Sequence, residues 1–134
     1  MCDPKKDLEN ILKVGVIGLG RMGMLHLMNC LQIDDVKVVA VAERLKKLLR
    51  EAQSAGVNRF YKDYHDLLGH SSDMDAVAIS LPNFLHFESI QLALEAGLNV
   101  FMENPLANAV EECRACLVER SGGKFGGHSV RFIE

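Results

Sequence analysis

The chain has 134 residues, of which 49% are hydrophobic and 25% are charged, and its formal net charge is −3. This length corresponds to one domain, and the composition is ordinary for a globular protein. An acidic balance argues against general nucleic-acid binding, and no apolar run approaches the roughly 20 residues that span a bilayer, so neither a nucleic-acid nor a membrane partner is expected.

The first ten residues are polar and charged, without the apolar stretch of a secretory signal. We therefore expect a flexible tail over residues 1–10, a single folded domain over residues 11–134 and a cytoplasmic location. In that location the cysteines are expected to be reduced thiols. The sequence contains four of them, namely Cys2, Cys30, Cys113 and Cys116.

Strand-like and helix-like segments alternate along the first half of the chain. A β-branched run predicts a strand over 12–17, and apolar residues at helical spacing predict a helix over 21–32. A nearly continuous apolar run predicts a buried parallel strand over 36–42. A basic amphipathic segment then predicts a helix over 44–55 that stops at Gly56. The apolar positions of the first helix are Met22, Leu25, Met28 and Leu31, and core packing is expected for Met22, Met24, Met28, Cys30 and Met102.

The second half of the chain continues this alternation. Pro82 ends a strand, and Asn83 is placed to cap the helix that follows. The expected elements are a weak strand at 59–61, a short helix at 63–68, a strand at 76–80, a helix at 84–96, a strand at 99–102, a helix at about 107–120 and a glycine-rich sixth strand at 124–128. The pattern predicts an α/β fold with a doubly wound, mostly parallel sheet of the Rossmann type, in three α/β/α layers. Its ligand crevice is expected at the carboxyl ends of the strands.

A glycine-rich segment with the pattern G-x-G-x-x-G lies between the first strand and the first helix. In this context Gly18 permits a tight turn, Gly20 lets the backbone approach a pyrophosphate, and Gly23 allows close helix–strand packing. An anionic pyrophosphate would face free N–H groups at the positive end of the helix. We therefore expect a dinucleotide to bind here, in contact with Gly18, Leu19, Gly20, Arg21, Met22 and Gly23.

An acidic residue at the end of the second strand points to the type of dinucleotide. Glu43 stands 20 residues after Gly23, where a carboxylate accepts hydrogen bonds from the adenosine ribose hydroxyls. The same carboxylate would repel a 2′-phosphate, which favours NAD as the cofactor. Arg44 directly beside it could pair with a 2′-phosphate, so NADP remains the alternative.

Four later segments resemble the N-terminal domain of the glucose–fructose oxidoreductase / inositol dehydrogenase (Gfo/Idh/MocA) family. They are Pro82-Asn83-x-x-His86, Ala93-Leu94-x-Ala96-Gly97, Glu103-Asn104-Pro105 and Gly127-x-x-x-Arg131-Phe132. With the glycine loop, the resemblance runs from about Leu12 to the last residue. It implies the NAD(P)-binding Rossmann domain of an oxidoreductase that acts on a hydroxyl-bearing carbon of the sugar or cyclitol type.

The resemblance also implies cofactor contacts beyond the glycine loop. The segment after the fourth strand would pass beside the cofactor, and the end of the fifth strand would lie near the nicotinamide ribose. The residues concerned are Leu81, Pro82, Asn83, His86, Glu103 and Asn104, with Ser129 and Arg131 at the nicotinamide end. Plainer roles stay open for three of them: a helix cap for Asn83, a hydrogen-bonded helix histidine for His86 and a solvated acid for Glu103.

Two departures from the family pattern bear on catalysis. Asn104 stands where the family has a lysine thought to assist proton transfer, and an amide is neither an acid nor a base at neutral pH. Losing such a group typically costs about two to four powers of ten in rate. The family also has a second domain, which supplies the substrate pocket and usually the oligomer interface, and we expect these 134 residues to lack it.

We therefore expect an NAD(P)-binding oxidoreductase domain that is not catalytically competent alone, and its catalytic residues stay unknown. A small-molecule substrate is expected only if a second domain is supplied, and the oligomeric state is open. The alternative is a non-catalytic dinucleotide-binding module or a regulatory subunit. Neither a metal site nor a redox site is expected, because Cys113-x-x-Cys116 falls inside a predicted helix and lacks further ligands. His65 and His70 are expected to face solvent.

Overall fold

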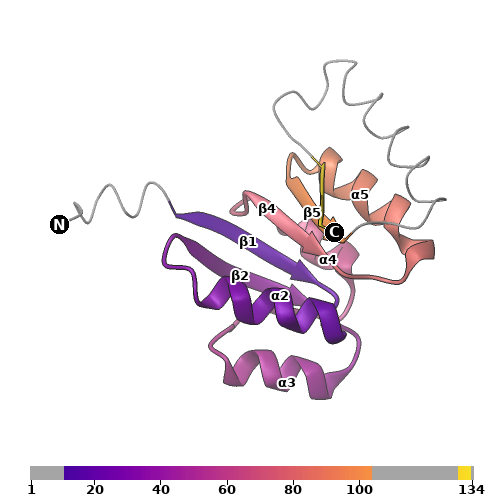
Figure 1. Cartoon of the computed structure of the whole chain (residues 1–134). Helices are drawn as coiled ribbons and strands as arrows, with labels where there is room; N and C mark the ends of the chain where they lie inside the picture. Colours follow the sequence, from indigo (N-terminus) through magenta and orange to yellow (C-terminus); the bar gives the residue numbers. More distant parts are fainter. Residues whose placement is uncertain (1–10, 104–129, 134) are drawn as a thin grey trace.

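The computed structural model describes residues 11–103 and 130–133. Within these ranges six strands form one sheet of order β3-β2-β1-β4-β5-β6, and all neighbouring strands run parallel. The strands are β1 (Leu12–Ile17), β2 (Val36–Ala42), β3 (Phe60–Tyr61), β4 (Ala76–Ile79), β5 (Asn99–Glu103) and β6 (Val130–Ile133). This topology confirms the predicted doubly wound parallel sheet, and its strand order reverses between β1 and β4 (Figure 1).

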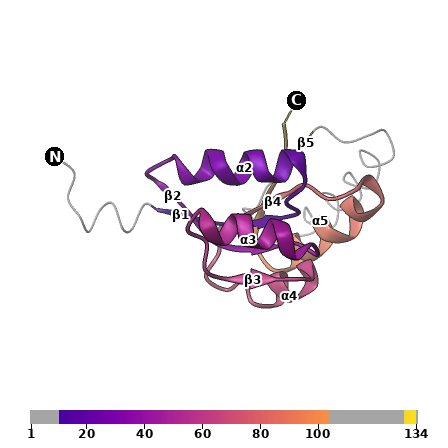
Figure 2. The same cartoon turned by 90° about the horizontal axis from the view of Figure 1, so that it is seen from below.

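Helices cover both faces of the sheet. They are α2 (Arg21–Leu31), α3 (Lys46–Ser54), α4 (Tyr64–Gly69) and α5 (His86–Glu95), with a 3₁₀ turn η1 (Asn83–Leu85) before α5. Figure 2 shows α2 and α4 on opposite sides of the strands. None of the helices in the described ranges is long and apolar enough to cross a membrane. The helix expected at 107–120 and the strand expected at 124–128 lie outside the described residues.

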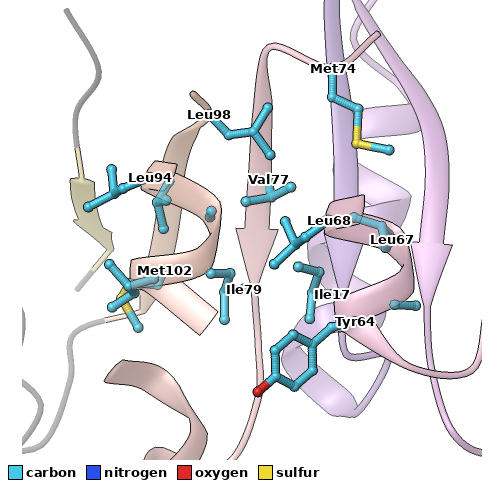
Figure 3. Packing of buried hydrophobic residues seen from close by; sticks show 14 of the residues in the cluster. Ile17, Tyr64, Leu67, Leu68, Met74, Val77, Ile79, Leu94, Leu98 and Met102 are labelled. Atoms are coloured by element: carbon cyan, nitrogen blue, oxygen red, sulfur yellow. The ribbon is translucent and has the colours of Figure 1, made fainter. Parts of the chain in front are cut away.

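Two apolar clusters hold these layers together. Because side chains alternate along a strand, Val16 of β1 packs toward α2 and α3, whereas Ile17 packs toward α4 and α5. The larger cluster includes Val77 and Ile79 of β4 together with Leu67 of α4 (Figure 3). Both faces of the central strands are therefore buried, which accounts for their nearly continuous apolar sequences.

The orientation of α2 differs from the expected one. Its inward face carries Gly23 and Leu27, both buried, whereas the apolar positions read from the sequence are 37–49% exposed. Those exposed side chains are Met22, Leu25, Met28 and Leu31. The expected core packing of Met22 and Met28 was therefore wrong. The reason is that Gly23 must lie against the end of β1, and this contact fixes the rotation of the whole helix.

The other residues expected in the core are at least partly buried, as predicted. Met102 is buried in the larger cluster, and Met24 and Cys30 are partly buried against the smaller one. Burial also raises the pKa of the Cys30 thiol above its ordinary value, which disfavours the reactive thiolate at neutral pH. Cys30 is a free thiol.

The start of α5 also differs from the sequence-based expectation. The N-cap position of α5 belongs to Leu85, which makes no side-chain cap hydrogen bond, whereas Asn83, the expected cap residue, begins η1. The backbone N–H of Leu85 donates to the Pro82 carbonyl at 2.9 Å, so the chain first closes a tight 3₁₀ turn. Two other predictions for helix ends agree with the structure. Gly56 and Gly97 follow helices α3 and α5, as expected, and both have a positive φ.

Candidate functional site

Two glycines of the loop between β1 and α2 are required by the packing of the protein itself. Gly18 has a φ of +87°, and a Cβ added to it would lie 2.5 Å from the carbonyl oxygen of Ser80. A Cβ on Gly23 would lie 1.8 Å from the carbonyl oxygen of Gly18. Any side chain at either position would push β1, α2 and the end of β4 apart.

Gly20 is different, because the protein gives no steric reason for its missing side chain. A Cβ added to Gly20 would meet no described atom within 4 Å. Gly20 precedes the first residue of α2, and that helix has neither a side-chain cap nor an acidic residue in its first turn. The unpaired N–H groups and the positive end of the helix dipole therefore face open space beside Gly20. We call this space the Gly20 cradle, and it fits the pyrophosphate of a dinucleotide.

The carboxylate of Glu43 connects the end of β2 to the glycine loop. Its Oε1 accepts a hydrogen bond from the Leu19 N–H at 2.8 Å, and its Oε2 accepts one from the Leu45 N–H at 2.9 Å. Each oxygen keeps a further lone pair, so the carboxylate can still accept bonds from a ribose. These two bonds also fix its position before any ligand arrives.

A cavity of about 1260 Å³ lies at the carboxyl ends of the strands, beside the glycine loop. This volume slightly exceeds the ~300–1,000 Å³ typical of small-ligand pockets, so it suits an elongated ligand. The strand arrows of β1 and β4 point to this edge in Figure 1. The cavity brings together many of the residues singled out in the sequence: Gly18, Gly20, Arg21, Met22, Gly23, Glu43, Arg44, Leu81, Pro82 and His86.

The remaining candidate residues fall into two groups. Leu19 does not line the cavity, because its side chain is fully buried in the core and its N–H already binds Glu43. For the others the structure gives less. It describes the backbone but not the side chain of Asn83, Glu103 and Arg131, and it does not describe Asn104 or Ser129. Arg131 belongs to β6, where its backbone pairs with Phe101 of β5.

Sequence reasoning missed the part of the cavity that follows β3. This strand has only two residues, so its carboxyl end gave no clear signal, although loops at that edge are expected to meet the crevice. The exposed aromatic ring of Phe84 at the rim was also missed. The additional lining side chains include Leu45, Lys62, Asp63, Tyr64, His65, Ser80, Phe84, Leu85 and Glu88.

A charged cluster connects α4 to α5 at the rim of this cavity. Nδ1 of His65 lies 2.6 Å from the Asp63 carboxylate, and Nε2 lies 2.6 Å from the Glu88 carboxylate. Asp63 also accepts the His65 backbone N–H at 2.8 Å and so caps α4. His65 and His70 are both exposed, as the sequence predicted.

The pKa values of this cluster follow from its geometry. Hydrogen bonds to Glu88 and then to Asp63 raise the pKa of His65 above its usual value. Hydrogen bonds from the His65 backbone and side chain lower the pKa of Asp63, and the His65 ring lowers the pKa of Glu88. Because both ring nitrogens face carboxylate oxygens, the charged imidazolium is the form that satisfies all three groups.

His86 holds the segment that follows β4. It is 6% exposed, and its Nε2 lies 2.8 Å from the carbonyl oxygen of Leu81, which can only accept. One ring nitrogen of His86 is therefore hydrogen-bonded at the wall of the cavity. Its other ring nitrogen, Nδ1, is buried and has no partner among the described residues.

Together, the parallel sheet, the glycine cradle at its switch point and the fixed carboxylate after β2 define a dinucleotide-binding Rossmann domain. Residues 12–121 match the family model described as "Oxidoreductase family, NAD-binding Rossmann fold". The chain belongs to this family, the Gfo/Idh/MocA oxidoreductases, as the sequence motifs predicted.

Similar proteins include several inositol dehydrogenases. Over 106 residues the chain is 39% identical to inositol 2-dehydrogenase of Klebsiella pneumoniae, which covers 77% of this chain and 31% of that enzyme. Over 97 residues it is 36% identical to myo-inositol 2-dehydrogenase of Thermotoga maritima, covering 72% of this chain and 29% of that enzyme. The crystal structure of scyllo-inositol dehydrogenase from Lactobacillus casei with NAD(H) and scyllo-inositol gives a TM-score of 0.78 at 29% identity, covering 91% of this chain and 36% of that one. The chain thus spans about a third of the length of these relatives.

The charged cluster predicts a pH-dependent contribution to stability. The raised pKa of His65 means that its contribution is complete below about pH 6.5 and is lost as the pH rises through the folded-state value. The lowered pKa values of Asp63 and Glu88 mean that their contributions are lost only in acid. In thermal unfolding, His65→Gln should therefore lower the midpoint more at about pH 6 than at about pH 9.

The matched control is His70→Gln. His70 is also exposed, but its Nδ1 faces the backbone carbonyl of Asp66 instead of a carboxylate. This control should show no such difference between the two pH values. An equal loss for His65→Gln at both values would show that the ion pairs contribute nothing measurable, as is common for exposed pairs.

Proposed function

We propose that this chain is the cofactor-binding part of an NAD-dependent oxidoreductase that acts on a hydroxyl-bearing carbon of a cyclitol or sugar. The observation that carries the proposal is the open cradle at Gly20, at an uncapped helix N-terminus beside the fixed carboxylate of Glu43. The names of the inositol dehydrogenases to which the chain is similar supply the substrate class.

Both the pyrophosphate and the ribose of the adenosine diphosphate half would have hydrogen-bonding groups in this site. The first N–H groups of α2 would donate to the pyrophosphate, where Gly20 lets the backbone come close. Glu43 would accept the ribose hydroxyls on the lone pairs that the Leu19 and Leu45 amides leave free. Because the backbone already orients this carboxylate, little conformational entropy is lost on binding.

The same carboxylate supports NAD over NADP. Two backbone hydrogen bonds hold it at the end of β2, so it cannot swing aside to admit a 2′-phosphate without losing both. Arg44 next to it is exposed and lines the cavity, and it is the group that would allow some NADP binding. We therefore propose NAD as the preferred cofactor.

Catalysis also needs a group that moves a proton, besides the residues that hold the cofactor. A bound NAD supplies the hydride acceptor, and the residues described here would hold and orient it. Asn104, in place of the lysine of the family pattern, carries an amide that neither gives nor takes a proton at neutral pH. This residue favours a second candidate function, a dinucleotide-binding module or regulatory subunit that does not catalyse.

The cradle at Gly20 is tested by Gly20→Ala. The added methyl group meets open space in the protein but occupies the position of the pyrophosphate, so folding should be preserved and NADH affinity should fall by about tenfold or more. The measurement is a titration that follows nicotinamide fluorescence, with circular dichroism to verify the fold.

Gly69→Ala is the control for this substitution. Gly69 also has open space around its Cβ position, but it lies outside the cavity lining. NADH binding should be unchanged in this variant. Failure of the unmodified chain to bind NADH at about millimolar concentration would refute the proposed function, since that is near the weak limit of specific binding.

Glu43→Ala tests the choice of cofactor. Removing the carboxylate loosens the glycine loop for both dinucleotides, but it removes a hydrogen bond to the 2′-hydroxyl only from NADH and removes repulsion of the 2′-phosphate only from NADPH. The NADH-to-NADPH affinity ratio should therefore fall by about tenfold, within the range for one or two hydrogen bonds to a charged group. An unchanged ratio would count against a ribose-binding role for Glu43.

Turnover by the chain alone tests whether its own residues form a complete active site. We expect little or no formation of NADH when myo-inositol and NAD are added, because Asn104 is no acid or base and the chain spans about a third of its relatives. The myo-inositol 2-dehydrogenase of Thermotoga maritima is the positive control. Appreciable turnover by this chain would show that its own residues complete the site.

A further inference from the structure

The charged cluster of Asp63, His65 and Glu88 lies between two walls of the cavity. Asp63 follows β3 and caps α4, whereas Glu88 lies in the first turn of α5, close to the segment that follows β4. All three residues line the cavity. The ring of His65 therefore connects the two sides of the cavity mouth, with a contact of 2.6 Å to each carboxylate.

A second contact between α4 and α5 is apolar and lies deeper. Leu67 and Leu68 of α4 share a buried cluster with Ile90 and Leu94 of α5. This apolar contact does not depend on charge, so it holds the two helices together at every pH. The charged cluster joins their first turns, where the cavity opens. A change in its charge is therefore expected to alter the cavity mouth without unfolding the domain.

The neutral form of His65 cannot keep both carboxylate contacts. Only one nitrogen of a neutral imidazole carries a proton, so the other would direct its lone pair at a carboxylate oxygen. Asp63 is two residues away and also accepts the backbone N–H of His65, so this contact is local and needs little ordering of the chain. The contact to Glu88 joins two helices, and it is the one expected to open when His65 loses its proton.

The same proton changes the charge at the cavity mouth. One imidazolium between two carboxylates leaves a net charge of −1, and a neutral ring leaves −2. The pyrophosphate of a dinucleotide is an anion, so the second form repels it more strongly. The loss of the contact to Glu88 and the added repulsion therefore act in the same direction, and both weaken binding when His65 is neutral.

Three further groups face the cluster from α4 and from the ends of β2 and β3. The Tyr64 ring stacks on the His65 ring, with the centroids 4.2 Å apart. Hydrogen bonds from His65 and, to a smaller extent, the charge of Arg44 lower the pKa of Asp63. Lys62 lines the cavity beside Asp63. The two cations offset part of the negative charge, and the proton on His65 sets how much of it remains.

The directions of the pKa shifts make His65 the group of this cluster that titrates near neutral pH. Hydrogen bonds to Glu88 and then to Asp63 raise the pKa of His65, so its proton is lost above about pH 6.5. The pKa values of Asp63 and Glu88 are lowered by His65, so both carboxyls stay ionised there. Burial, followed by the hydrogen bond to Glu88, raises the pKa of Tyr64 to about 12, so its hydroxyl stays neutral.

Resting on the proposed function, we propose that the charged cluster makes dinucleotide binding depend on pH, with NADH bound more tightly when His65 is protonated than when it is neutral. By linkage, bound NADH then raises the affinity of His65 for its proton. Binding therefore takes up part of a proton from solvent at pH values where free His65 is partly neutral.

The first test is a titration of the full chain with NADH between about pH 6.5 and pH 9, followed by nicotinamide fluorescence at constant, low ionic strength. Affinity should fall about three- to tenfold over this range, as expected for one exposed ion pair and one unit of charge. In His65→Gln, whose side chain cannot be protonated, this fall should be absent. Circular dichroism verifies the fold at each pH.

His70→Gln is the matched control for this titration. His70 is exposed like His65, but it lies outside the cavity lining and its Nδ1 faces the backbone carbonyl of Asp66. This variant should keep the pH dependence of the unmodified chain.

The second test measures the proton itself and needs no substitution in the chain. Calorimetric titration with NADH at about pH 7.5, in two buffers that differ in their heat of ionisation, gives the number of protons taken up. The unmodified chain should take up a fraction of one proton, and His65→Gln should take up less.

The same pH profile for the unmodified chain and His65→Gln overturns the inference and leaves the proposed function intact, since NADH still binds. A His65→Gln variant that melts at lower temperature near pH 6 but takes up as many protons as the unmodified chain also overturns it, because the cluster would then have a structural role alone. Absence of NADH binding at every pH removes the proposed function and this inference with it.

Discussion

The fold and the site both depend on the close approach of β1, α2 and the end of β4. No Cβ fits at Gly18 or Gly23, because backbone atoms of Ser80 and Gly18 already occupy those positions. This contact sets the rotation of α2, so that Leu27 enters the core and an apolar stripe remains outside. It also places the uncapped N-terminus of α2 at the switch point of the sheet, where the strands leave a crevice.

The second constraint is electrostatic and acts through Glu43. A carboxylate held by the Leu19 and Leu45 amides connects the end of β2, the glycine loop and the start of α3. Charge-assisted hydrogen bonds of this kind are stronger than neutral ones, so the loop is shaped in advance for its ligand. Preorganised donors and acceptors then contribute to binding without a further cost of ordering.

Much of the fold could be predicted from sequence because its signals are local. The β-branched runs of β1 and β2, the glycine pattern and Glu43 each carry their meaning within a few residues. The face of α2 could not be predicted, since spacing identifies an apolar stripe but only the contact of Gly23 with the Gly18 carbonyl decides which side is buried. Likewise, β3 is too short to reveal that Tyr64 and His65 meet the cavity. The sequence-based roles of Asn104 and Ser129 remain predictions.

The shortness of β3 has a consequence for behaviour in concentrated solution. As an outer strand of the described sheet, β3 offers only two residues along which the backbone of another molecule could extend the sheet. Arg59 immediately before it is held by Asp73 at 2.7 Å, which places charge beside this edge. Short strands flanked by charge are a common protection against edge-to-edge aggregation, so this side of the molecule is a poor template for amyloid-like growth.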